Sequence, residues 1–185
     1  MNDEGDHLTA AELTSNVQLL LVAGHETMVN QIGLSMVTLF EHPDQMELLR
    51  ARPDLWPQAV EELLRHSQLT SAIMPRIAAQ DFMLGGTPIG ADEAVIPVIG
   101  TANRDPAGSR TRTGSTSCVP RRRRTSGPVT ARTNCLGAQL AKLELRIALG
   151  SLLSRFPTLA PAVDLADLNW KTGLSVRAVE ELPVT

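Results

Sequence analysis

The nonapeptide LLLVAGHET, residues 19–27, decides the fold class of this 185-residue chain. Its first half is apolar on all sides, and further apolar residues recur at helical spacing before and after it. This pattern predicts one long helix whose centre is buried in a larger body. Thr9 provides an N-cap and Glu12 the acid of a capping box, so we expect the helix to run from about Thr9 to Glu41.

The rest of the chain predicts a mainly α fold with a small antiparallel β-sheet. Two shorter helices are expected at residues 44–50 and 57–66, each next to a proline that favours a helix start. After Pro75, short apolar segments separated by glycines are typical of antiparallel strands. A second buried helix follows Cys135 and ends near Phe156.

Composition excludes several classes of protein. The chain is 43% hydrophobic, and its 17 basic and 20 acidic residues give a net charge of −3. Nucleic acids and anionic membranes need a basic surface, so neither is expected as a partner. The most apolar stretch, residues 17–23 with Gln18 within it, is too short for a membrane span, and the acidic first residues do not resemble a signal peptide. We expect a cytoplasmic protein with reduced cysteines.

The segment Ala23-Gly24-His25-Glu26-Thr27 combines residues suited to chemistry on a helix. Small residues such as Ala23 and Gly24 let a ligand approach the backbone, and the neighbouring acid and alcohol, Glu26 and Thr27, can relay protons. Alternatively, Gly24 and Thr27 are packing residues and Glu26 is a surface acid. Both interpretations are open for the segment taken alone.

Two further segments carry charged residues at informative positions. Glu62 and Arg65 are three residues apart on a predicted helix, where they can form a bidentate ion pair, although most such pairs are solvated and contribute little. Arg76 opens the strand-rich region, which closes with the sequence ANRDP at residues 102–106. A guanidinium suits the binding of a carboxylate, but an exposed arginine without a ligand is the ordinary alternative for Arg76.

Cys135 lies immediately before the last predicted helix, in the sequence NCLGAQLAKLEL at residues 134–145. A helix N-terminus favours negative charge on a cysteine sulfur through its dipole and its free N–H groups. A single cysteine is more often an inert buried thiol. The order and spacing of all four segments decide between these interpretations.

In that order, the four segments resemble the C-terminal half of a bacterial cytochrome P-450. The resemblance implies that Cys135 ligates the iron of haem b (iron protoporphyrin IX) as a thiolate, and that Arg76 contacts a haem propionate. It also implies cofactor-binding positions at Ala23 and Gly137. Residues 23–27 look like the oxygen-activation motif of the family. In that motif Gly24 would admit oxygen, Thr27 and Glu26 would manage proton delivery, and the threonine hydroxyl often disturbs the helix hydrogen bonding.

The resemblance further implies the activity of a haem-dependent monooxygenase. Such an enzyme oxidises a small organic substrate with dioxygen and takes electrons from a donor of the ferredoxin and ferredoxin reductase type. Glu62 and Arg65 would be structural, since the family's E-x-x-R helix locks the core beside the haem. The C-terminal half alone would lack the N-terminal helices that supply much of the substrate pocket.

The chain resembles the family in two separated parts. Residues 1–107 hold the oxygen-activation helix, the E-x-x-R helix and the sheet, and residues 134–185 hold the ligand cysteine, its helix and a tail. Residues 108–133 are rich in Ser, Thr, Arg, Gly and Pro, include the basic run 121–124, and by themselves predict disorder. The family's F-x-x-G-x-x-x-C loop is absent from this segment.

A changed reading frame accounts for the aberrant segment. Codons with a GC-rich third base, read from the third base of each codon, give Phe-Ala-Asp-Pro-Asp-Arg-Leu-Asp-Val for Gly108 to Cys118. The same reading gives a peptide ending Gly-His-Gly-Pro-His for Arg124 to Thr133. Both resemble family sequences, which indicates two compensating frameshifts in the gene or in its sequencing. The basic run and Cys118 then have no functional role.

Two alternatives to an active monooxygenase are open. The first is a truncated, frame-damaged product that binds no haem and catalyses nothing. The second is a small helical interaction protein whose exposed apolar helices bind a partner.

Overall fold

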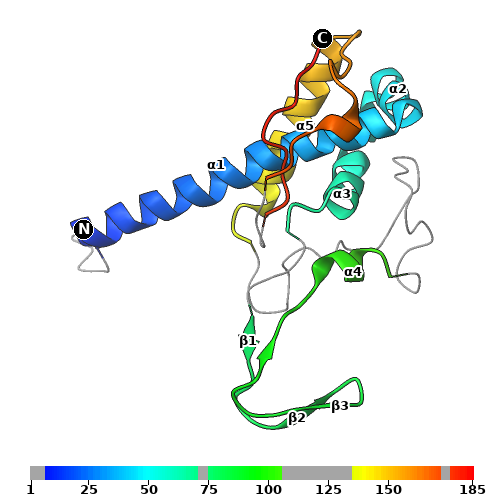
Figure 1. Ribbon diagram of the computed structural model, residues 1–185. Helices are drawn as coiled ribbons and strands as arrows, with labels where there is room; N and C mark the ends of the chain where they lie inside the picture. Colours follow the sequence, from blue (N-terminus) through cyan, green and yellow to red (C-terminus); the bar gives the residue numbers. More distant parts are fainter. Residues whose placement is uncertain (1–6, 71–74, 106–134, 172–175) are drawn as a thin grey trace.

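The computed structural model describes residues 7–70, 75–105, 135–171 and 176–185. Its helices and strands are α1 (Ala10–Glu41), α2 (Pro43–Ala51), η1 (Pro53–Leu55), α3 (Trp56–His66), β1 (Arg76–Ile77), β2 (Phe82–Leu84), β3 (Thr87–Ile89), β4 (Ala94–Val95), α4 (Ile99–Asn103), α5 (Ala138–Arg155) and η2 (Leu165–Asp167). The mainly α fold with small antiparallel sheets is confirmed. Helices α1, α2, α3 and α5 pack together, and the β2–β3 hairpin lies apart from them (Figure 1).

Helix α1 has two different environments along its length. Its C-terminal part lies against the other helices and is buried, from Asn30 to Leu39 on the inward faces. Its N-terminal part extends beyond the packed helices (Figure 1), and the side chains from Ala10 to Thr27 are exposed. The predicted helix is therefore confirmed, but the apolar run at residues 19–22 is not buried among the described residues.

The start of α1 is fixed by the predicted capping box. Glu12 N–H donates to Thr9 Oγ1 at 3.2 Å, and Thr9 N–H donates to Glu12 Oε2 at 2.8 Å. These bonds satisfy two backbone groups that a helix N-terminus leaves free. The bond from Thr9 N–H is the largest cause that holds the pKa of Glu12 below its usual range.

Replacing Thr9 with alanine is expected to destabilise the first turn of α1 by about 1 kcal/mol, since the N-cap bond is lost. The stabilisation from Glu12 should be complete above the ordinary glutamic acid pKa of about 4.3, and should be lost as the pH falls through the lowered folded value. Amide hydrogen exchange at Leu13 and its neighbours measures the effect.

Thr14→Ala is the matched control, because the Thr14 hydroxyl donates to the Ala10 carbonyl within the helix and caps nothing. Equal acceleration of exchange in the two variants would contradict the capping role of Thr9.

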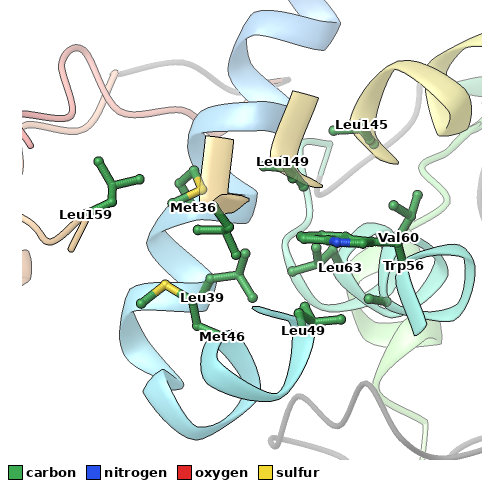
Figure 2. Packing of buried hydrophobic residues seen from close by; sticks show 12 residues of the cluster. Met36, Leu39, Met46, Leu49, Trp56, Val60, Leu63, Leu145, Leu149 and Leu159 are labelled. Atoms are coloured by element: carbon green, nitrogen blue, oxygen red, sulfur yellow. The ribbon is translucent and has the colours of Figure 1, made fainter. Parts of the chain in front are cut away.

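The hydrophobic core lies where four helices meet (Figure 2). Trp56 at the start of α3 packs against α5 at Gly150, where a Cβ would lie 3.3 Å from Trp56 Nε1, so a larger residue would push the indole away. The side chains of Leu145, Leu149 and Leu153 line the inner face of α5 and are at most 2% exposed. The other members of the cluster are Met36, Leu39, Met46, Leu49, Ala59, Val60, Leu63 and Leu159.

Among the described residues, the strands are divided between two two-stranded sheets, where the sequence suggested a single small one. Strand β1 pairs with β4, and β2 pairs with β3, both antiparallel. Gly85 and Gly86 join β2 to β3 with φ of 57° and 87°. Two consecutive positive φ angles are typical of tight hairpin turns, which favour glycine. The turn itself sets the register of β2 against β3, so this hairpin needs no third strand.

The C-terminal tail returns to the helical body. It makes isolated antiparallel bridges between Pro161 and Val184 and between Trp170 and Val179. Within the described part of the chain, no helix is both long enough and apolar enough to cross a membrane. The expectation of disorder at residues 108–133 lies outside the described residues.

Candidate functional site

The predicted oxygen-activation motif lies on the exposed part of α1. Ala23, Gly24, Glu26 and Thr27 are all exposed. The Thr27 hydroxyl donates to the Ala23 carbonyl at 2.6 Å, and α1 continues through the motif without interruption. This is the bond from a threonine hydroxyl to the carbonyl four residues earlier, which often bends a helix, although the helix is not interrupted here.

The surface beside Gly24 is open. A Cβ built on Gly24 would meet no other atom within 4 Å, apart from its own helix backbone and chain neighbours. The preceding side chains of Leu19, Leu20, Leu21 and Val22 are 63–66% exposed. A large apolar ligand could therefore reach the helix backbone at this position, which is what the small residues at 23 and 24 were predicted to allow.

Arg76 begins β1, where it pairs with Val95 of β4. Its side chain is exposed, and no carboxylate pairs with it among the residues that the structure describes. A guanidinium in this state can bind an added carboxylate through two parallel hydrogen bonds. The position therefore fits the predicted contact with a haem propionate.

Cys135 is an exposed free thiol directly before α5. Its carbonyl accepts a hydrogen bond from Ala138 N–H at 3.2 Å, so Cys135 forms part of the turn that leads into the helix. Gly137 is the N-cap residue and no side chain caps this end. The first N–H groups of α5 therefore have no side-chain cap, and the thiolate at Cys135 stays a prediction.

The predicted ion pair between Glu62 and Arg65 is confirmed. Arg65 Nε and Nη2 donate to the two carboxylate oxygens of Glu62 at 2.7 and 2.6 Å, and Arg65 Nη1 donates to the Asn103 carbonyl at 2.9 Å. The two side chains are 8% and 12% exposed. The hydrogen bonds to Glu62 raise the pKa of Arg65 above its usual range, although burial opposes this. The pair fixes α3 to the end of α4.

The candidate residues come from three separate elements. Residues 23–27 lie on α1, Arg76 on β1 and Cys135 before α5; of these elements, α1 and α5 pack directly on each other. No group of three or more His, Cys, Asp or Glu side chains is suited to a metal ion in the described ranges. Cys135 is the one cysteine among the described residues, and haem iron needs only one protein thiolate, so this residue type is compatible with haem.

Two features of this region were not predicted from the sequence. The first is the backbone carbonyl of Asn103, which completes the hydrogen bonding of Arg65. The sequence ANRDP indicated this segment but did not predict the hydrogen bond between the Asn103 carbonyl and Arg65. The second is a cavity between α1, the end of α3 and the C-terminal tail. Its residues are spread over the chain, and no sequence pattern connects them.

Comparison with known proteins identifies the family to which this chain is similar. The family model for cytochrome P450 matches residues 1–108. The chain is 44% identical over 180 residues to cytochrome P450 105C1 of a Streptomyces species, and 40% identical over 188 residues to the biotin biosynthesis cytochrome P450 of Bacillus subtilis. These alignments cover 96% and 98% of this chain, but 46% and 45% of the relatives.

Solved structures give the same result. The LnmA cytochrome P450 hydroxylase of Streptomyces atroolivaceus is 41% identical, with a TM-score of 0.88 over all of this chain and 47% of that protein. The cytochrome P450 PksS of Bacillus subtilis is 36% identical, with a TM-score of 0.90 over 99% of this chain and 47% of that protein. The helical fold thus corresponds to part of a larger enzyme fold. This chain belongs to the cytochrome P450 family and spans about half the length of the relatives it matches.

Proposed function

We propose that this chain forms part of a haem-dependent monooxygenase, which oxidises a small organic substrate with dioxygen. The observation that carries the proposal is the exposed free thiol of Cys135, three residues before the first residue of α5, in a chain of the cytochrome P450 family. Haem bound through a thiolate supplies electron density that favours cleavage of the O–O bond.

The chain's own residues would hold the cofactor at three positions. Cys135 would bind the iron, and Arg76, which pairs with no carboxylate of the described residues, would bind a propionate. Ala23 would lie against the macrocycle, since its small side chain leaves the α1 backbone accessible. Gly137 would leave room beside the ligand cysteine, because a Cβ there would meet no other atom within 4 Å.

Proton delivery is proposed for Thr27 and Glu26, with Gly24 leaving space for oxygen. The hydroxyl of Thr27 must first exchange its 2.6 Å bond to the Ala23 carbonyl for a bond to the reacting group or to water. Glu26 precedes Thr27 by one residue and is exposed, so its carboxylate can take protons from solvent. The two residues would then hold and pass protons at Thr27 Oγ1.

Partners are proposed by analogy with relatives. The solved structures include the P450 TamI bound to tirandamycin C, and P450BioI in complex with an acyl carrier protein that bears a hexadecenoic acid. A small organic substrate therefore suits the family, whether free or attached to a carrier. We propose an electron donor of the ferredoxin and ferredoxin reductase type, while a cytoplasmic location stays a prediction.

We also propose that residues 108–133 carry a changed reading frame between two family segments, 1–107 and 134–185. The end of the family-model match at residue 108 supports this proposal, because the predicted change begins at Gly108. Resequencing the gene across this segment tests it. An uninterrupted frame that encodes these same residues would refute the frameshift.

One observation favours an inert product instead. The side chains of Leu19, Leu20, Leu21 and Val22 are more than 60% exposed, and such a surface is unfavourable in water unless something covers it. The same side chains would serve an interaction protein, whose partner would bind to α1.

A carbon monoxide spectrum separates these candidates. The purified full chain, supplied with haem and reduced, is expected to show the thiolate-type shift of the haem absorption band on addition of carbon monoxide. A spectrum of the imidazole type, or no bound haem after gel filtration, would exclude the proposed function for this chain and leave the inert and interaction candidates.

A further inference from the structure

A cavity of about 340 Å³ lies between the C-terminal part of α1, the end of α3, the residue after α4 and the C-terminal tail. This volume is at the small end of the range of roughly 300–1,000 Å³ that is usual for ligand sites. Thr38 of α1 lines the cavity, and it follows Thr27 by eleven residues. At a rise of about 1.5 Å per residue, the cavity is roughly 16 Å along α1 from the proposed oxygen motif.

One part of the cavity wall is cationic. Arg104 and Arg177 both line it, and neither pairs with a carboxylate within the described part of the chain. The guanidinium carbon of Arg177 lies 4.2 Å from the centroid of the Trp170 ring, so this charge is held in place by stacking. Among the described lining residues there is one acid, Glu41, and His42 and His66 add two imidazoles. The balance of charge favours an anion.

Another part of the wall is apolar. It consists of Leu34 and Val37 on α1 and the ring of Trp170 on the tail. Thr38 and Ser67 also line the cavity, and their hydroxyls share one hydrogen bond at 2.7 Å. A ligand therefore meets an apolar surface with two guanidinium groups beside it, an arrangement that suits a molecule with an apolar body and one anionic group.

We infer that this cavity binds a small organic carboxylate, with its apolar body against Leu34, Val37 and Trp170 and its carboxylate at Arg104 and Arg177. The planar fork of a guanidinium matches a carboxylate through two hydrogen bonds. The site is separate from the proposed haem residues and does not depend on them. The chain would thus hold a second ligand at the opposite end of α1 from its N-terminus.

Isothermal titration of the full chain with benzoate, benzamide and inorganic phosphate tests the inference. Benzoate should bind at one site. Benzamide, which has the same shape without the charge, should bind at least about tenfold more weakly because it forms no charge-assisted hydrogen bond. Phosphate should also bind more weakly, because it has no apolar body. Equal binding of benzoate and benzamide, or of benzoate and phosphate, would overturn the inference.

Variants locate the site. Arg104→Gln and Arg177→Gln should each weaken benzoate binding by about tenfold, whereas Arg177→Lys should weaken it less because the charge remains. Arg146→Gln, at an exposed position on α5 outside the cavity, is the matched control and should bind benzoate as the unsubstituted chain does. Arg104 does not stack on Trp170, so Arg104→Gln still tests whether the cavity binds benzoate even if Arg177→Gln is unstable. Unchanged binding in Arg104→Gln would overturn the inference.

Discussion

Replacement of Cys135 with serine is expected to abolish the thiolate-type carbon monoxide spectrum of the haem-loaded chain. Serine removes the sulfur and retains the size and approximate shape of the side chain, so the turn into α5 should persist. Its alcohol is a far weaker ligand for haem iron than a thiolate, because it does not ionise near neutral pH and lacks a soft donor atom. Haem that remains bound should show the spectrum of a neutral or oxygen ligand.

Cys118→Ser is the control for this experiment. The chain has two cysteines, and Cys118 belongs to the segment whose reading frame we propose to be changed. Its replacement should leave the spectrum as it is. A thiolate spectrum that persists in Cys135→Ser and disappears in Cys118→Ser would reverse the assignment of the ligand.

Replacement of Glu62 with glutamine is expected to lower the free energy of unfolding by about 3 kcal/mol. The amide keeps the size of the side chain but removes the charge that faces Arg65. The Arg65 side chain is only 8% exposed, so its charge would stay buried after losing the carboxylate of Glu62, and breaking a buried ion pair by removing one partner is costly. Urea unfolding followed by far-UV circular dichroism measures the loss.

The matched control is Asp54→Asn, the same acid-to-amide change in an exposed pair. Asp54 accepts two hydrogen bonds from Arg52 at 2.9 Å, and the two side chains are 62% and 58% exposed. Water and salt screen such a pair, so its removal should not change stability measurably. Similar losses of unfolding free energy in both variants would contradict the claim that the Glu62–Arg65 pair stabilises the fold because it is buried.

The four longer helices could be predicted closely from the sequence because their signals are local, whereas the five-residue helix α4 was not predicted. The capping box of Thr9 and Glu12 fixed the start of α1, and Pro43 marked the start of α2. Strand pairing was less predictable. The β2–β3 hairpin closes through Gly85 and Gly86, which are adjacent in sequence, but β1 and β4 pair across a gap of 16 residues between Ile77 and Ala94, and no short motif specifies that partner.

The candidate site was predictable only where a motif lies on one element. The Glu62–Arg65 pair follows from helical spacing, and its geometry was confirmed. Exposure of α1 at residues 19–27 was not expected, since an apolar helix predicts burial without saying what covers it. The carboxylate cavity could not be predicted either, because Leu34, Arg104 and Trp170 become neighbours only through the tertiary fold.

The two tryptophans give this chain two separate optical reporters. The sequence contains no tyrosine, so Trp56 and Trp170 dominate its intrinsic fluorescence. Trp56 is 5% exposed beside Gly150, whereas Trp170 is half-buried beneath the guanidinium of Arg177. Emission from Trp56 should be at shorter wavelength and should follow the packing of the four helices. Emission from Trp170 should follow the tail and whatever enters the cavity beside it.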